Sequence, residues 1–405
     1  MPGRNAPPRA GALIESLRGL GYISADARQV DLTFHWDGDR SWIRVMDDGT
    51  GMSDPQLEAA MQLGAKDPRE TRAATDLGRF GMGLKTASFS QARRLTVASR
   101  RVGEALACLR WDLDRLADGS GEWTLLEGAD PAAADALAPL DEMASGTIVL
   151  WEKLDRIVTE GFTVDMLFAL IDEIQSSLSM TFHRLIEGPD AAFVLRINGK
   201  KVEPWDPFLI GHTGKGWESR EYTIPGPHPV RVQCNVLPHK DRLSAREAEA
   251  AAGPAGWSSQ QGFYIYRNRR LLVAGGWLRL GERGRAWTRD EPHRLARIRI
   301  DITNAADADW KINVLKSMAS PPVTLRPHLK RLGQETRNRA RRVFAHRGRL
   351  VTTSGGPGDG LPDVWEPRKR AKGTSYRISR QHELVASVLD RAGPLRRDLE
   401  ALLRL

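Results

Sequence analysis

Two glycine-containing segments and one threonine carry the residue types best suited to chemistry. The first is the turn at residues 47–52, Asp-Asp-Gly-Thr-Gly-Met, which follows an apolar strand pattern. The Asp47 carboxylate can accept a hydrogen bond from the exocyclic amine of adenine, and Gly49 and Gly51 let the backbone approach the ring closely. Met52 ends the turn. The same residues also favour an ordinary β-turn, so the motif by itself leaves the turn-only interpretation open.

The second segment is a glycine-rich loop that begins 31 residues after Asp47. Its glycines free backbone N–H groups to face phosphate oxygens, and a helix that starts near Lys85 adds a favourable dipole. The loop lacks the Gly-Lys-Ser/Thr ending of a P-loop. The residues expected on this side of the site are Gly78, Phe80, Gly81, Met82, Gly83, Leu84 and Lys85.

The third feature is Thr147, which opens an apolar strand at residues 146–151. Its hydroxyl could hold the Asp47 carboxylate or a bridging water. Threonine at the start of a strand is also common for packing reasons alone, so this position says little without the other two.

Strands and helices must position these segments. The first half of the chain alternates between period-2 and helical patterns, with the turn Asp37-Gly38-Asp39 indicating a hairpin. The segment 128–145 is rich in alanine, aspartate and proline and indicates a peripheral insertion. The predicted helices span residues 10–20, 54–65, 85–91 and 163–186, and the predicted strands span 30–36, 42–46, 94–99 and 146–151.

The second half has its own mixed pattern. Asn198-Gly199 between apolar runs indicates a hairpin at 193–202, strands follow at 262–266 and 296–302, and a basic helix runs from 327 to 346. The fold class is therefore α+β. We expect a first domain, which holds the glycine motifs, at 1–190, a second α+β domain at 191–350, a basic Gly/Pro linker at 351–373 and a helical segment at 374–405.

Composition limits the class of protein. Hydrophobic residues make up 41% and charged residues 27% of the 405, as in ordinary globular proteins. No stretch approaches the roughly 20 apolar residues of a membrane span, and the start lacks a secretion signal, so we expect a cytoplasmic protein without membrane partners. Cys108 and Cys234 have no metal-ligand spacing. The net charge of +9 favours a polyanionic partner such as DNA.

The order of the motifs is more specific than any one of them. The chain resembles the GHKL ATPases, whose ATP-binding domain is the Bergerat-type α/β sandwich. The resemblance lies in the order of its elements: a strand, Asp-x-Gly-x-Gly-Met, a helix, a glycine loop with lysine, a strand, and a further strand that opens with Gly-Thr. The segment 77–90 looks most like MORC proteins and bacterial MutL-like relatives. The resemblance implies that Asp47 binds adenine, that the glycine loop binds phosphates, and that ATP is the ligand, with Mg²⁺ where its asparagine ligand is present.

The resemblance extends to the second region, which is similar to the transducer domain of these families. There a basic residue reaches the γ-phosphate and couples nucleotide state to domain arrangement. The matching segment is 310–317, and we assign this catalytic role to Lys316 in preference to Lys311; an ordinary surface lysine is the alternative.

One family motif is missing. The relatives carry, on an early helix, an acidic residue that activates water and an asparagine four positions later that binds magnesium. Here the chain passes from Tyr22 to Ile23 as though most of that helix were absent, and neither Glu15 nor Asp26 can take the role of the acid. Loss of a general base lowers a rate by roughly 10²- to 10⁴-fold, so the resemblance implies an ATPase while the missing motif leaves hydrolysis an open question.

The resemblance and its missing motif imply two alternative functions. The first is a nucleotide-driven clamp that dimerises on ATP and acts with DNA, in a restriction-modification, phage-defence or repair context with a nuclease or restriction partner. The second is a hydrolysis-deficient nucleotide-gated or DNA-binding scaffold. A histidine kinase and a chaperone are disfavoured, because no phosphoacceptor-helix pattern and no acidic linker is evident. The basic helix offers Arg326, Lys330, Arg331, Arg337, Arg339, Arg341 and Arg342 for phosphate contacts.

Overall fold

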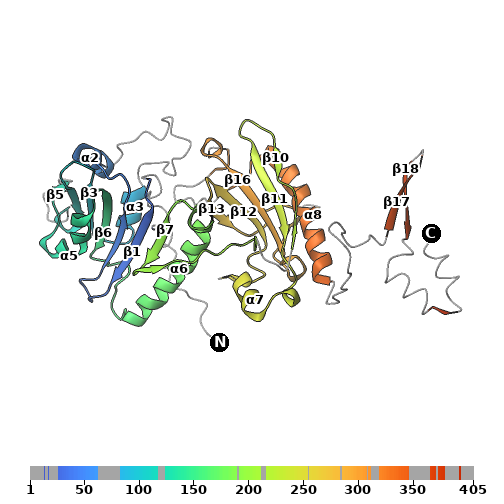
Figure 1. Ribbon diagram of the computed structural model, residues 1–405, viewed down its shortest axis with the longest axis horizontal. Helices are drawn as coiled ribbons and strands as arrows, with labels where there is room; N and C mark the ends of the chain where they lie inside the picture. Colours follow the sequence, from blue (N-terminus) through green and yellow to red (C-terminus); the bar gives the residue numbers. More distant parts are fainter. Residues whose placement is uncertain are drawn as a thin grey trace. The chain divides into compact units, whose positions relative to one another are not determined.

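The computed structural model describes residues 26–62, 83–116, 124–188, 191–210, 216–253, 255–282, 285–307, 309–311, 319–345, 365–370, 373–378 and 392–393, with Leu13 and Leu17. Residues 1–347 form one compact unit, whose described residues contain two large sheets and the two-stranded sheet β14–β15, and residues 348–405 form another (Figure 1). Within these described ranges, no helix is long and apolar enough to cross a membrane.

The first sheet has eight strands in the order β5-β4-β3-β6-β2-β1-β7-β8. Neighbouring strands are antiparallel, except that β1 and β7 are parallel. The antiparallel pairing of β1 with β2 confirms the hairpin predicted around residues 37–39. The strands are β1 Gln29–His35, β2 Trp42–Asp47, β3 Arg94–Arg100, β4 Ala107–Asp112, β5 Leu126–Glu127, β6 Gly146–Glu152, β7 Val194–Ile197 and β8 Lys200–Lys201.

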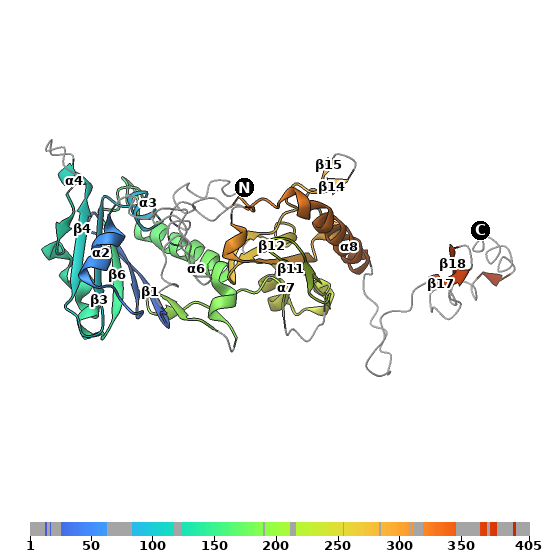
Figure 2. The same cartoon turned by 90° about the horizontal axis from the view of Figure 1, so that it is seen from above.

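Three helices cover one face of this sheet. They are α2 (Asp54–Met61), α3 (Gly83–Phe89) and α6 (Val164–Ile186), and α2 lies against β4 (Figure 2). The 23-residue α6 confirms the helix predicted at 163–186; the Thr163 side chain accepts from Met166 N, and apolar positions three or four apart face the sheet. This face holds the main core of the first sheet.

The opposite face is covered by the segment that was expected to be peripheral. It forms η2 (Pro131–Ala133), α5 (Ala134–Leu137) and η3 (Ala138–Glu142). Ala133, Ala136 and Leu140 are at most 2% exposed and pack on strands β3 and β6. The prediction was wrong because the small alanine side chains, which indicate little core volume in sequence, fit closely against the sheet.

The hairpin predicted at 193–202 forms around Asn198 and Gly199, which both have positive φ. Asn198 Oδ1 accepts from Phe34 N at 2.7 Å, so the turn is tied to β1. Its strands β7 and β8 belong to the first sheet, which therefore extends past the boundary expected at residue 190.

The second sheet has the order β10-β11-β16-β12-β13, with β9 paired to β11. Helix α8 (Arg326–Ala345), predicted as the basic helix, packs Leu329, Leu332 and Ala340 on one face. The other elements are β9 Trp217–Glu218, β10 Tyr222–Ile224, β11 Val230–Val236, α7 Ala245–Ala252, β12 Gly262–Arg267, β13 Arg270–Ala274, β14 Gly281–Glu282, β15 Arg285–Ala286 and β16 Ala296–Ile302.

The last half of α6 contacts the other face of the second sheet. Met180 packs against the cluster of Phe208, Tyr264, Tyr266 and Leu271. His183 Nε2 and the Tyr266 hydroxyl lie 2.8 Å apart in a buried hydrogen bond. One helix thus belongs to the core of the first sheet and also contacts the second.

In the C-terminal unit, β17 (Trp365–Arg370) and β18 (Gly373–Ile378) form an antiparallel hairpin. A linker to residue 373 and a helical segment from residue 374 were expected here, and the paired strands differ from both. The remainder of the helical prediction, apart from residues 392–393, lies outside the described residues.

Candidate functional site

Strand register brings three polar side chains into one row on the helix-covered face of the first sheet. Asp47 on β2 pairs with Thr147 on β6, and Thr147 pairs in turn with Ser99 on β3. Alternation along each strand sends these three side chains to the same face as core residues such as Val45 and Val97. Asp47, Thr147 and Ser99 lie at the edge of the apolar core on that face.

Asp47 is a buried carboxylate, only 8% exposed. Its Oδ1 accepts from Gly49 N at 2.9 Å, so the turn itself holds the side chain. Burial raises the pKa of Asp47 to about 6; the Gly49 N–H opposes this shift and the nearby Asp48 charge adds to it. In the described part of the chain no cation is among the groups that shift this pKa, so the ionised carboxylate keeps its capacity to accept from a ligand amine.

The backbone of the turn is pressed against the end of β3. Gly51 has φ of +69°, and a Cβ at this position would lie 1.8 Å from Arg100 O. Only glycine fits there. The next residue, Met52, donates its N–H to Ser99 Oγ at 2.8 Å. The turn is therefore fastened to the strand that carries one end of the polar row.

Ser99 is the residue that the sequence analysis missed. Its hydroxyl lies 2.9 Å from Thr147 Oγ1 and 3.1 Å from Gly146 O, with Met52 N as a further partner. The Thr147 hydroxyl is therefore hydrogen-bonded to Ser99, and Thr147 is the register neighbour of Asp47. A sequence signal existed, because Ser99 is a polar residue at a buried position of an apolar strand.

Asp48, the other carboxylate of the turn, has a structural role. Its Oδ1 accepts from Arg28 N at 2.7 Å and from Gln29 N at 2.8 Å, at the start of β1. The two adjacent aspartates are thus distinguished by what they contact. Asp48 accepts hydrogen bonds from the backbone at the start of β1, whereas Asp47 lies on the core side of the sheet.

Lys85 has a position different from the one expected of a phosphate contact. It is 2% exposed, and its Nζ donates to Ala60 O at 2.9 Å and to Gln62 O. Both carbonyl groups lie at the C-terminal end of α2, where the helix dipole favours a cation. In this structure the Lys85 ammonium joins α3 to α2.

Other predicted site residues lie partly or wholly outside the described residues. Gly83 begins α3, and Leu84 packs against the core of the first sheet. The early helix is represented by Leu13 and Leu17, both buried in that core, while Glu15 and the Tyr22–Ile23 junction lie outside the described ranges. The same holds for Gly78, Phe80, Gly81, Met82 and Lys316.

The metal prediction depends on acidic and polar ligands near the phosphates. In the ranges that the structure describes, no group of three or more His, Cys, Asp or Glu side chains is arranged to hold a metal ion. Asp26, one of the acids considered, is exposed and precedes β1. Magnesium binding by this chain therefore stays a prediction.

The basic helix separates into an inner and an outer face. Arg337, one of the cations expected to contact phosphates, does not lie on the solvated face: it is 7% exposed and lies over the rings of Trp277 and Trp287. A helix buries part of its circumference whatever its charge pattern suggests. The exposed cations are Arg326, Lys330, Arg331, Arg339, Arg341 and Arg342.

The Bergerat-type nucleotide-binding sandwich has this architecture. It combines a mainly antiparallel sheet, helices that cover one face, and a buried carboxylate held by a glycine turn at the end of a strand. Residues 22–147 match the family described as histidine kinase-, DNA gyrase B- and HSP90-like ATPase. The match supports a GHKL-type ATPase domain, of a family that binds ATP, in this segment, as its motifs predicted. No curated protein matches the chain.

Proposed function

We propose that this protein binds ATP with its adenine amine on Asp47 and its phosphates on the loop at residues 78–85. The observation that carries the proposal is the buried Asp47 carboxylate, 8% exposed, whose backbone partner Gly49 leaves acceptor capacity for a ligand. A carboxylate without a cation is costly to bury, and a ligand amine offsets that cost. Thr147 and Ser99 then line the adenine side as polar neighbours.

On the phosphate side, glycine N–H groups and the start of α3 would face the anionic oxygens. Lys85 is held by two carbonyl oxygens at the end of α2. Its role is therefore twofold in our proposal: it holds α2 to α3, and its positive charge favours phosphate binding nearby.

We further propose that nucleotide binding drives a switch between the two sheets and closure of two copies as a clamp. Lys316 from the second region would contact the γ-phosphate. Helix α6 supports this coupling, because it is part of the first core and also bonds to the second sheet through His183 and Tyr266. A shift at the nucleotide would reach the second sheet along this helix.

We propose DNA as the partner of the closed clamp, with the exposed cations of α8 contacting phosphates. Six exposed basic residues on this helix face solvent with a single acidic neighbour on the helix, Glu335. Such contacts bind without reading the base sequence. A restriction, defence or repair context and a nuclease partner belong to the same proposal.

The alternative is a hydrolysis-deficient, nucleotide-gated scaffold. It is favoured by the missing acid and asparagine of the early helix, because without them neither water activation nor magnesium is provided for. Binding would then order the clamp without turnover.

The deciding experiment measures ATP affinity of the full chain by calorimetry, with and without magnesium, and turnover with radiolabelled ATP. Binding with magnesium-dependent turnover that Asp47→Ala abolishes supports the motor, and binding without turnover supports the scaffold. Absence of ATP binding by folded protein contradicts both. Sedimentation with a non-hydrolysable ATP analogue tests dimerisation.

A further inference from the structure

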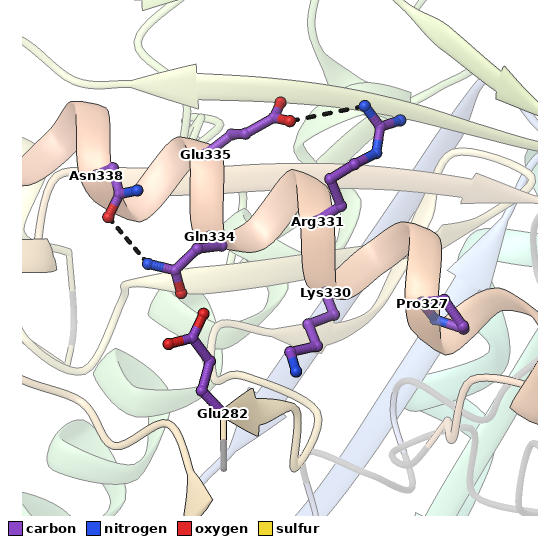
Figure 3. A pocket seen from close by; sticks show the side chains of 7 residues that line it. All are labelled: Glu282, Pro327, Lys330, Arg331, Gln334, Glu335 and Asn338. Carbon is purple, nitrogen blue, oxygen red and sulfur yellow. Dashed lines mark hydrogen bonds and ion pairs between the residues drawn. The ribbon is translucent and has the colours of Figure 1, made fainter.

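A cavity beside α8 contains a buried arginine with unused hydrogen-bonding capacity. Two cavities adjoin along this helix and share Glu282, Gln334 and Asn338. Figure 3 shows the first, of about 390 Å³, where Glu282 from β14 faces the side chains of α8. Its cations Lys330 and Arg331 are balanced by Glu282 and Glu335, and Arg331 pairs with Glu335 at 3.6 Å.

The second cavity has a different charge. It measures about 320 Å³ and includes three arginines, Arg285, Arg337 and Arg341, against the single carboxylate of Glu282. His293, Thr288 and the amides of Gln334 and Asn338 add polar groups. An excess of positive charge over a polar lining favours an anion.

Arg337 is the fixed member of this set. Its side chain is 8% exposed, and its guanidinium lies 4.6 Å from the centre of the Trp277 ring and 5.1 Å from that of Trp287. The two rings hold the guanidinium plane in place. Trp287 is itself held close, because a Cβ at Gly333 would lie 2.8 Å from its ring.

The guanidinium is incompletely paired. Nη2 donates to Asp290 Oδ2 at 3.4 Å, and that carboxylate also contacts His293 at 2.5 Å. Nη1 is buried and has no hydrogen-bond partner among the residues that the structure describes. An unpartnered buried donor on a charged group is costly, and an anionic acceptor that entered the cavity would remove the cost.

We propose that this cavity binds a phosphate group, with Arg337 as the pre-positioned contact and the exposed Arg285 and Arg341 closing on it. The planar, forked guanidinium suits phosphate oxygens better than a point charge does. The phosphate could belong to a free phosphorylated ligand or to a nucleic-acid backbone. The inference deepens the DNA part of the proposed function and does not depend on the Asp47 pocket.

The test uses the full chain and two probes: pyrophosphate by calorimetry, and a short fluorescein-labelled DNA duplex by anisotropy. The double variant Arg285→Ala/Arg341→Ala removes two exposed cations of the cavity, so it should fold. Arg342→Ala, an exposed cation of the same helix that lines neither cavity, is the matched control. Any pyrophosphate bound by the nucleotide loop is common to both proteins.

We expect pyrophosphate to bind the double variant about 10- to 100-fold more weakly than the control. If DNA affinity falls as well, with a shallower dependence on salt, the ligand is a nucleic-acid backbone. If only pyrophosphate binding falls, the ligand is a free phosphate compound. Equal pyrophosphate binding by variant and control, or none by either, overturns the proposal. ATP affinity measured in parallel reports on the Asp47 pocket separately.

Discussion

Replacing Asp47 by asparagine should stabilise the unliganded protein and weaken ATP binding at the same time. Asparagine keeps the shape of the side chain and an oxygen that can accept from Gly49 N, so the turn should persist. What changes is the charge. The variant loses the ionised acceptor proposed for the adenine amine, and it also loses the cost of burying that charge.

The magnitude follows from the pKa of Asp47, which burial raises from 3.8 to about 6. Because the folded pKa lies above the unfolded one, the unfolded chain ionises more easily, and the penalty grows from about pH 4 to pH 6 and is constant above. A shift of about 2 pKa units corresponds to about 3 kcal/mol at most. Loss of a charged hydrogen bond to ligand costs about 1.5–3 kcal/mol, or roughly 10- to 100-fold in affinity.

Thermal unfolding at pH 7.5 and pH 4, with ATP titration at pH 7.5, measures both effects. The melting temperature of Asp47→Asn should exceed that of the unchanged protein at pH 7.5, by roughly 2–4 °C for each kcal/mol gained, and match it at pH 4. Asp48→Asn is the control: it alters the backbone contacts to Arg28 and Gln29 and should leave ATP affinity unchanged. A destabilised Asp47→Asn protein with full ATP affinity would refute the reasoning.

Three further predictions concern the same site. Adenosine affinity should fall about tenfold for each pH unit below 6, since the carboxylate of Asp47 becomes protonated there, and calorimetry of Asp47→Asn should show no such dependence. Lys85→Met should lower the free energy of unfolding by about 2–3 kcal/mol, because the carbonyl groups of Ala60 and Gln62 lose a charged donor; urea unfolding that matches the unchanged protein would contradict the contact. Ser99→Ala should cost about 1–2 kcal/mol by leaving Met52 N without its acceptor, whereas Ser90→Ala, an exposed control, should cost less in the same assay.

Much of the local structure follows from short-range patterns. The period-2 runs around Asp37-Gly38-Asp39 predicted the β1–β2 hairpin, and helical spacing predicted α6 and α8. Each of these elements depends on residues close together in sequence, where backbone propensity and the periodicity of apolar side chains determine the secondary structure. Segment 128–145 was misjudged because its alanines bury little surface individually and gain their packing only from the sheet opposite.

The order of the nucleotide-binding motifs could also be identified from the sequence, and the family match over residues 22–147 agrees with it. The closer likeness to MORC and MutL proteins stays a prediction. Asp47 could be chosen because of its place in the order of the motifs, since the turn by itself also fits an ordinary β-turn. Its raised pKa could not be predicted, since burial depends on residues distant in sequence.

By itself, then, the sequence determined the strands, helices and motif order that mark an ATP-binding domain, because these rest on local spacing. Only the tertiary structure decided which side chains meet. Strand register placed Ser99 beside Thr147 across 48 residues of chain, Lys85 reached the carbonyl groups of α2, and helix rotation turned Arg337 inward onto two tryptophans. Register and rotation are set by the packing of whole faces, which no single segment encodes.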